Sequence, residues 1–245
     1  MNAYVMDGKR CMVNFDGLGD YGLKTVNLTC NASGAAEAAR RGDVVVIVDV
    51  IDMSTSAEVV LECGAAAIFG AAPSGCKVPV NLNPDRMGYL AGKTALKYKT
   101  QLVVVSEPRY GTEEERKKRA ETAMLGVARS GAEVELIVPN IGTEIYKLAD
   151  FDNKVVLFIS DTGGVAYDAA YNNGAPAVVT ATVTRTQHKK GIKPAMAGVE
   201  RSIEQALKHG TGITVVAASA NSMEDVLAAQ FLTQLIVEKG FLNQN

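Results

Sequence analysis

The spacing of apolar and polar residues predicts an α/β protein. The apolar run at residues 44–51 is interrupted only by Asp49, and a run so rich in β-branched residues is typical of a strand buried on both faces of a parallel sheet. In the polar segment that follows, Thr55 and Glu58 have the spacing of a capping box, which predicts the start of a helix. We expect this helix to end at Gly64, before the next strand.

Similar alternation continues along the chain. The segment 154–182 repeats the layout of residues 43–70, with an apolar strand, a polar turn, a helix, a glycine and a strand of small residues. Alternating strands and helices with short connections predict a three-layer α/β/α fold with a mainly parallel sheet, and we interpret residues 1–245 as a single α/β domain. Beyond the first unit, strands are expected at residues 11–15, 24–29, 101–105, 133–139, 154–159, 175–182 and 213–217.

Two later helices are predicted in more detail. Thr112 and Glu115 form a second capping-box pattern, which predicts a long helix ending near Ser130. The last helix has an amphipathic pattern, with one face turned to the core. The apolar residues expected on that face are Leu227, Phe231, Leu232, Leu235 and Ile236.

Composition and charge narrow the class of partner. A chain of 245 residues with 47% hydrophobic residues can bury a large core. Its formal net charge of -2 gives no electrostatic basis for binding nucleic acid or an anionic membrane. No apolar run reaches the roughly 18 residues needed to cross a bilayer, and the N-terminus lacks the layout of a signal peptide. We therefore expect a cytoplasmic protein with a small-molecule substrate.

Candidate chemistry lies where the strands end, because the carboxyl ends of parallel strands meet at one edge of a sheet. A carboxylate inside a buried strand is costly unless it is paired or bound to metal, so Asp49 requires an explanation. Paired carboxylates in a chain with only two histidines suit Mg²⁺, which binds one or two carboxylates plus water and phosphate. The candidate metal ligands are Asp49, Asp52, Glu224 and Asp225.

The catalytic and substrate-binding candidates come from the same strand ends. Arginines, hydroxyl groups and helix N-termini can hold an anion. Several of these positions are also where helices take N-caps, so capping is the structural alternative for them. The catalytic candidates are Asp49, Asp52 and Asp161. The substrate-binding candidates are Ser54, Thr55, Arg109, Thr162, Arg185, Ser219 and Asn221.

Four stretches carry a family resemblance. Residues 44–70, VVVIVDVIDMSTSAEVVLECGAAAIFG, resemble the N-terminal motif of the 2-phosphosulfolactate phosphatase family, in which a buried strand ends in Asp-Val-Leu-Arg-Ala-Ser/Thr-Thr before a helix closed by Asn-Gly-Ala. Residues 79–84, 156–164 and 213–230 resemble further parts of the family in the same order. The resemblance does not cover residues 101–151, which we interpret as an inserted strand-helix-strand unit.

The resemblance implies an α/β enzyme that uses Mg²⁺ to remove phosphate from phosphorylated 2-hydroxy acids. Asp49, Ser54, Thr55, Glu224 and Asp225 keep the family's residue types. Three positions depart from the family, where its Arg, loop Asp and motif Asn are replaced by Asp52, Asn81 and Thr162.

Our leading hypothesis is therefore a Mg²⁺-dependent phosphoric monoester hydrolase, with Asp161 as a third ligand or base and Arg109 or Arg185 on the anion. The alternative is a divergent member that binds a small organic acid or metabolite without phosphatase activity. A third hypothesis is an oligomeric scaffold with its site between subunits, and we expect a homo-oligomer.

Overall fold

The computed structural model describes residues 5–6, 9–10 and 24–243, and its strands form two parallel four-stranded sheets besides a short antiparallel pair. The strand order is β3-β10-β4-β9 in the first sheet and β5-β8-β6-β7 in the second. The predicted α/β class is confirmed, and the expected strand at residues 11–15 lies outside the described residues. The strands are β1 (Val5–Met6), β2 (Lys9–Arg10), β3 (Val26–Cys30), β4 (Val44–Val48), β5 (Ala67–Ala71), β6 (Leu102–Ser106), β7 (Val134–Pro139), β8 (Val155–Ile159), β9 (Val178–Thr180) and β10 (Ile213–Ala217).

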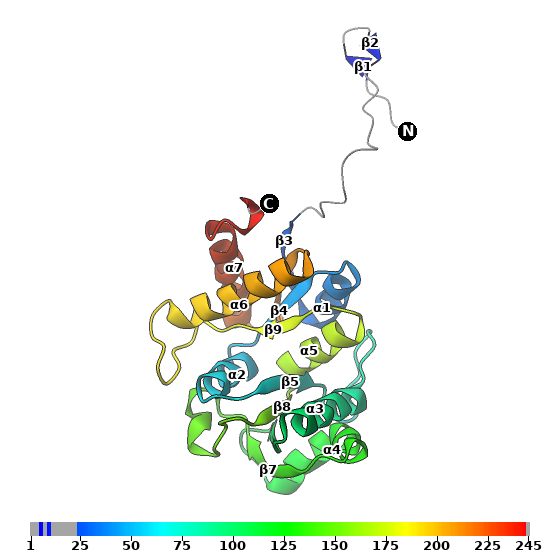
Figure 1. Ribbon diagram of the computed structural model, residues 1–245, viewed down its shortest axis with the longest axis vertical. Helices are drawn as coiled ribbons and strands as arrows, with labels where there is room; N and C mark the ends of the chain where they lie inside the picture. The colour runs from blue at the N-terminus through cyan, green and yellow to red at the C-terminus, as the bar shows by residue number, and fades with distance from the viewer. Residues whose placement is uncertain (1–4, 7–8, 11–23, 244–245) are drawn as a thin grey trace.

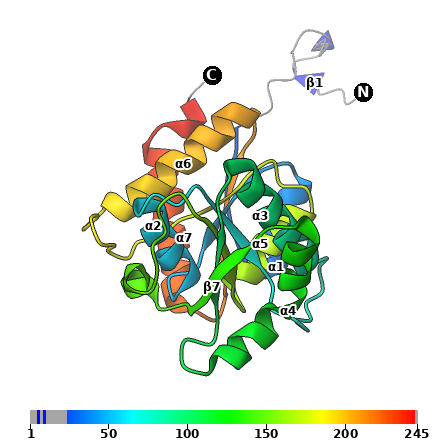
Figure 2. The same ribbon diagram turned by 60° about the horizontal axis from the view of Figure 1, so that its bottom comes forward.

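Helices cover both faces of the first sheet, with α1 and α5 on one face and α6 and α7 on the other. On the second sheet, α3 and α4 pack side by side (Figure 2). Among the described residues, no helix is both long enough and apolar enough to cross a membrane. The helices are α1 (Asn31–Arg40), α2 (Met53–Glu62), α3 (Pro84–Tyr98), α4 (Glu113–Ser130), α5 (Gly163–Asn172), α6 (Lys193–His209) and α7 (Met223–Glu238), with the 3₁₀ turns η1 (Gly142–Lys147) and η2 (Phe241–Asn243).

The strand β4 explains the apolar run that the sequence shows. Its five residues are all buried, and successive side chains point to opposite faces of the sheet. Val45 and Ile47 pack into the core shared with α1 and α5. The alternate residues, Val44, Val46 and Val48, pack against α6 and α7. The same alternation directs the next odd-numbered residue, Asp49, toward the α5 side.

Two connections cross between the sheets in opposite directions. The unit β4-α2-β5 leaves the first sheet and enters the second, and the unit β8-α5-β9 returns to the first. Figure 1 shows α2 and α5 between β9 above and β5 below. The two segments with repeated layout therefore form a reciprocal crossing, and the N-termini of both crossing helices come to the junction of the sheets.

One of the two capping boxes is confirmed. Thr112 Oγ1 accepts the N–H of Glu115 at 3.1 Å, and Glu115 Oε2 accepts the N–H of Thr112 at 2.7 Å. The box predicted at Thr55 and Glu58 is wrong, because the N-cap of α2 is Asp52, three residues before Thr55. Both residues lie inside the helix and use their side chains for contacts with other segments.

The buried face of α7 also differs in part from the prediction. Leu232, Leu235 and Ile236 are buried as expected, but Leu227 and Phe231 are exposed. Ala228 and Ala229 are buried in their place. The small alanine side chains let the helix lie close to β3 and β10, and this close packing rotates the larger apolar residues outward.

Candidate functional site

Asp49 lies directly after β4, where the carboxyl edge of the first sheet meets the N-terminus of α5. Its side chain is buried, and its Oδ2 accepts the N–H of Gly163 at 2.7 Å and the hydroxyl of Thr162 at 2.8 Å. A Cβ at position 163 would stand 2.5 Å from this oxygen, so only glycine permits the approach. The N–H of Met53 also interacts with the carboxylate. Asp49 therefore sits between the N-termini of α2 and α5.

Ser54 and Thr55 shape the turn that carries Asp49. The Ser54 hydroxyl donates to the carbonyl of Ile47 at 2.9 Å and accepts the N–H of Asp49 at 3.0 Å. Thr55 Oγ1 donates to the carbonyl of Val50 at 2.7 Å and lies 2.8 Å from the Thr182 hydroxyl. Both predicted substrate-binding residues are buried and fix the backbone around Asp49.

The second oxygen of Asp49 has no partner. Oδ1 is buried, and no residue in the described part of the chain forms a hydrogen bond with it. Burial raises the pKa of this carboxyl group above its usual value, against the lowering effect of the bonds from Thr162 and Gly163, and the charge of Asp52 adds to the rise. A buried acceptor without a donor from the protein can be satisfied by a water molecule, a proton or a cation.

Two further carboxyl groups lie within electrostatic reach of Asp49. Asp225 Oδ1 accepts the N–H of Val50 at 2.8 Å, and burial, with the charge of Asp49 adding, raises the pKa of Asp225 to about 6. Glu107 Oε2 accepts the N–H of Asp161 at 3.0 Å, and the pKa of Glu107 is likewise raised, chiefly by burial. Three acidic groups therefore converge at this edge of the molecule.

Glu107 is not among the site residues predicted from the sequence. It is the first residue after β6, which pairs with β8 in the second sheet, and its backbone N–H donates to the carbonyl of Ile159. Its place directly after a buried strand, the same place that Asp49 occupies after β4, marks it from the sequence as part of a strand-end polar cluster, although no role was predicted for it. It belongs to the unit at residues 101–151, which the family resemblance does not cover.

Asp52 and Asp161 are each paired with an arginine of that unit. Arg109 bonds both carboxylate oxygens of Asp52, with Nε to Oδ2 at 3.1 Å and Nη2 to Oδ1. The carboxylate of Asp161 forms an ion pair with Arg119, and its side chain is 60% exposed.

Of the remaining predicted residues, Ser219 borders the acidic group, because its backbone interacts with the carboxylate of Asp225, whereas Arg185, Asn221 and Glu224 are exposed. The Arg185 side chain is exposed, and the backbone carbonyl of Arg185 accepts a hydrogen bond from the Thr143 hydroxyl at 3.1 Å. Ser219 Oγ accepts the N–H of the exposed Asn221 at 3.2 Å, and Glu224 is exposed. In the described part of the chain, no group of three or more His, Cys, Asp or Glu side chains is arranged to hold a metal ion.

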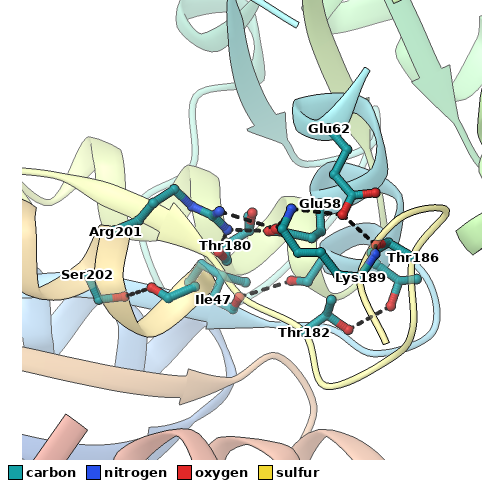
Figure 3. Close-up of polar contacts among 12 residues, drawn as sticks. Ile47, Glu58, Glu62, Thr180, Thr182, Thr186, Lys189, Arg201 and Ser202 are labelled. Atoms are coloured by element: carbon teal, nitrogen blue, oxygen red, sulfur yellow. Dashed lines mark hydrogen bonds and ion pairs between the residues drawn. The ribbon is translucent and has the colours of Figure 1, made fainter. Parts of the chain in front are cut away.

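A buried ionic network supports α2 behind the site (Figure 3). The fully buried Glu58 pairs with Arg201 of α6 and with Lys189, whose Nζ lies 3.0 Å from Glu58 Oε1. Lys189 also contacts Glu62 at 2.8 Å, and the Thr186 hydroxyl donates to the same oxygen at 2.6 Å. The network fastens the loop between β9 and α6, which carries Arg185, to the outer side of α2.

Comparisons with known proteins add no relative to this picture. No protein-family model matches the chain, and no curated protein matches it. The resemblance to the 2-phosphosulfolactate phosphatase family remains a hypothesis based on short motifs, so the function has to be argued from the geometry of the site.

Proposed function

We propose that this chain is a Mg²⁺-dependent hydrolase that removes phosphate from a small phosphorylated 2-hydroxy acid. The observation that carries the proposal is the unpartnered, buried Oδ1 of Asp49 at the carboxyl edge, with Asp225 and Glu107 close enough that the charge of Asp49 adds to the effect of burial in raising the pKa of each. Acidic groups held together in this way are stabilised by a cation. A phosphate group bound beside that cation would meet the N-termini of α2 and α5.

The residues fit a cation that needs few protein ligands. Asp49 and Asp225 would hold it, and Mg²⁺ commonly takes one or two carboxylates while water and phosphate oxygens complete its coordination. Asp52 is less suited, because Arg109 already occupies both of its oxygens. When bound, Mg²⁺ would neutralise charge on the transferred phosphoryl group.

The chain's own residues would position the substrate and move a proton. The hydrogen bonds from Thr162 and Gly163 fix Asp49, so its free oxygen keeps one orientation. Glu107, whose raised pKa keeps a proton available nearer neutral pH, is better suited than the ion-paired Asp161 to exchange a proton with water or the leaving group.

A second function is favoured by a different observation. Asp49 Oδ2, Asp52 and Asp161 each have partners within the protein, and no set of three metal ligands occurs in the part of the chain that the structure describes. A protein that binds a small organic acid without hydrolysing it would need only the arginines and helix N-termini.

Phosphate release separates the two functions. The purified chain is incubated with 2-phospholactate and related phosphorylated hydroxy acids, with Mg²⁺ or with EDTA, and inorganic phosphate is measured. We expect release that requires Mg²⁺, that is lost in Asp49→Asn and that persists in the control Glu113→Gln, at an exposed ion pair of α4. Circular dichroism establishes that both variants are folded. Absence of Mg²⁺-stimulated release across the panel refutes the hydrolase, and stabilisation by organic acids without metal then supports the binding protein.

A further inference from the structure

Arg109 is held beside the first turn of α2, far in sequence from the residues it contacts. Nε and Nη2 bond the two oxygens of Asp52, which lies 57 positions earlier in the chain. Nη1 forms no hydrogen bond to any residue that the structure describes, and the side chain is 40% exposed. The guanidinium is therefore fixed in orientation by Asp52, while one of its edges is open to a further acceptor.

A polar corner after β7 lies against the same turn of α2. Gly142 packs closely there, since a Cβ added to it would stand 3.3 Å from Asp52 Oδ1 and 3.7 Å from Arg109 Nη2. Its carbonyl lies 3.3 Å from the hydroxyl of Ser56. Because Ser56 follows Asp52 by one helical turn, the corner spans one face of the helix.

Asn140 brings an unused donor to this corner. Its side chain is 1% exposed, and its Oδ1 accepts the Ser56 hydroxyl at 2.6 Å. Its Nδ2 is buried and has no partner among the described residues. A buried amide that lacks an acceptor is uncommon in a native protein and points to a bound acceptor.

We propose that Arg109 and Asn140 form a subsite for the carboxylate group of the substrate, with Asp52 as the positioning residue that orients the guanidinium. Because Asp52 already neutralises part of the charge of Arg109, the subsite suits a monoanionic carboxylate better than a dianionic phosphate. The inference rests on the proposed function, in which the phosphate binds at Asp49. It gives residues 101–151 the role of selecting phosphorylated acids over simple phosphate esters.

The test compares two ligands that differ only in the carboxylate. Isothermal titration without added metal, so that neither ester is hydrolysed, measures the affinity of the full chain for 2-phospholactate and for isopropyl phosphate, which has a methyl group in its place. We expect Arg109→Gln to weaken 2-phospholactate binding about tenfold, the loss of one charge-assisted contact, and to leave isopropyl phosphate within about twofold. Asn140→Asp, which removes the donor and adds a negative charge, should act in the same direction.

Charge reversal tests the role of Asp52. Arg109→Asp alone should abolish the preference for 2-phospholactate, and combining it with Asp52→Arg should restore most of it, because the guanidinium returns to the same place. Arg109→Lys should recover only part of the preference, since an ammonium group cannot make the same paired contact. Circular dichroism of each variant separates lost binding from lost structure.

The outcomes also separate this inference from the proposed function. Equal loss of both ligands in Arg109→Gln, or no difference between the ligands in the unchanged chain, overturns the carboxylate subsite. Discrimination between the ligands without phosphate release leaves the subsite standing and refutes the hydrolase. Phosphate release from both esters at equal efficiency supports the hydrolase and overturns the subsite.

Discussion

The raised pKa of Asp225 makes the stability of the protein depend on pH. The carboxyl group has a pKa of about 6 in the folded chain against an ordinary value of 3.8, chiefly because it is buried. Between these two values the folded chain holds a proton that the unfolded chain has lost, so the free energy of unfolding falls as pH rises through this window. A difference of about two pKa units corresponds to a loss of about 3 kcal/mol in the free energy of unfolding. This loss is absent below pH 4 and complete above pH 6.

Asp225→Asn isolates this effect. The amide oxygen can still accept the N–H of Val50, so the local geometry is retained while the charge is removed. In urea unfolding followed by circular dichroism, we expect the variant to exceed the unchanged chain by about 2 to 3 kcal/mol at pH 7.5 and to match it near pH 4. Asp161→Asn, at an exposed carboxylate, is the control and should change neither value by more than about 0.5 kcal/mol.

Mg²⁺ should act on the same charge. If the cation binds between Asp49 and Asp225 as proposed, adding it at pH 7.5 raises the free energy of unfolding of the unchanged chain and has a smaller effect on Asp225→Asn. If the unchanged chain and Asp225→Asn showed the same dependence of stability on pH, ionisation of Asp225 would carry no free-energy cost in the folded chain. The explanation of its raised pKa by burial and repulsion would then be wrong.

Two more substitutions test the contacts around the site. Gly163→Ala would push a methyl group against Asp49 Oδ2, and we expect a loss of about 1 to 3 kcal/mol in thermal or urea unfolding; an unchanged stability would mean that α5 does not lie so close to Asp49. Glu58→Gln removes the buried carboxylate that Arg201 and Lys189 share, and it should lower the free energy of unfolding by about 3 kcal/mol and speed proteolysis of the loop between β9 and α6. The control Glu113→Gln, at an exposed ion pair, should have almost no effect. Equal behaviour of the two variants would contradict the role given to the network.

Local features were predictable from the sequence, and long-range pairings were not. The run at β4 marks a strand buried on both faces, and Asp49 stands out because a charge there needs compensation. The division into two sheets has no local signal, since a strand that ends in a helix has the same pattern whether the next strand joins the same sheet or another one. The ion pair between Arg109 and Asp52 likewise depends on the folded arrangement alone.

The failed capping box shows how tertiary contacts override a local signal. Thr55 and Glu58 have the spacing of the box, but the Ser54 hydroxyl accepts the N–H of Asp49 and closes the turn, so α2 starts earlier. Glu58 then lies in the second turn of α2 on its buried side, where Arg201 is the stronger partner for its carboxylate. At Thr112 and Glu115 both side chains face solvent and meet no competing partner, and the box forms.

Asp49 has more than the role of a helix cap. Capping α5 needs one oxygen, and an asparagine could supply it without charge. The carboxylate instead places a second oxygen in a buried position without a donor, and its charge adds to the effect of burial in raising the pKa of Asp225 and Glu107. The buried oxygen without a donor and the repulsion between the carboxylates both destabilise the folded chain when the groups are ionised and no cation is bound. The reciprocal crossing of the two sheets holds all three groups at one edge. A divalent cation bound there would remove the repulsion and use the free oxygen, and this is the basis of the metal-assisted chemistry that we propose.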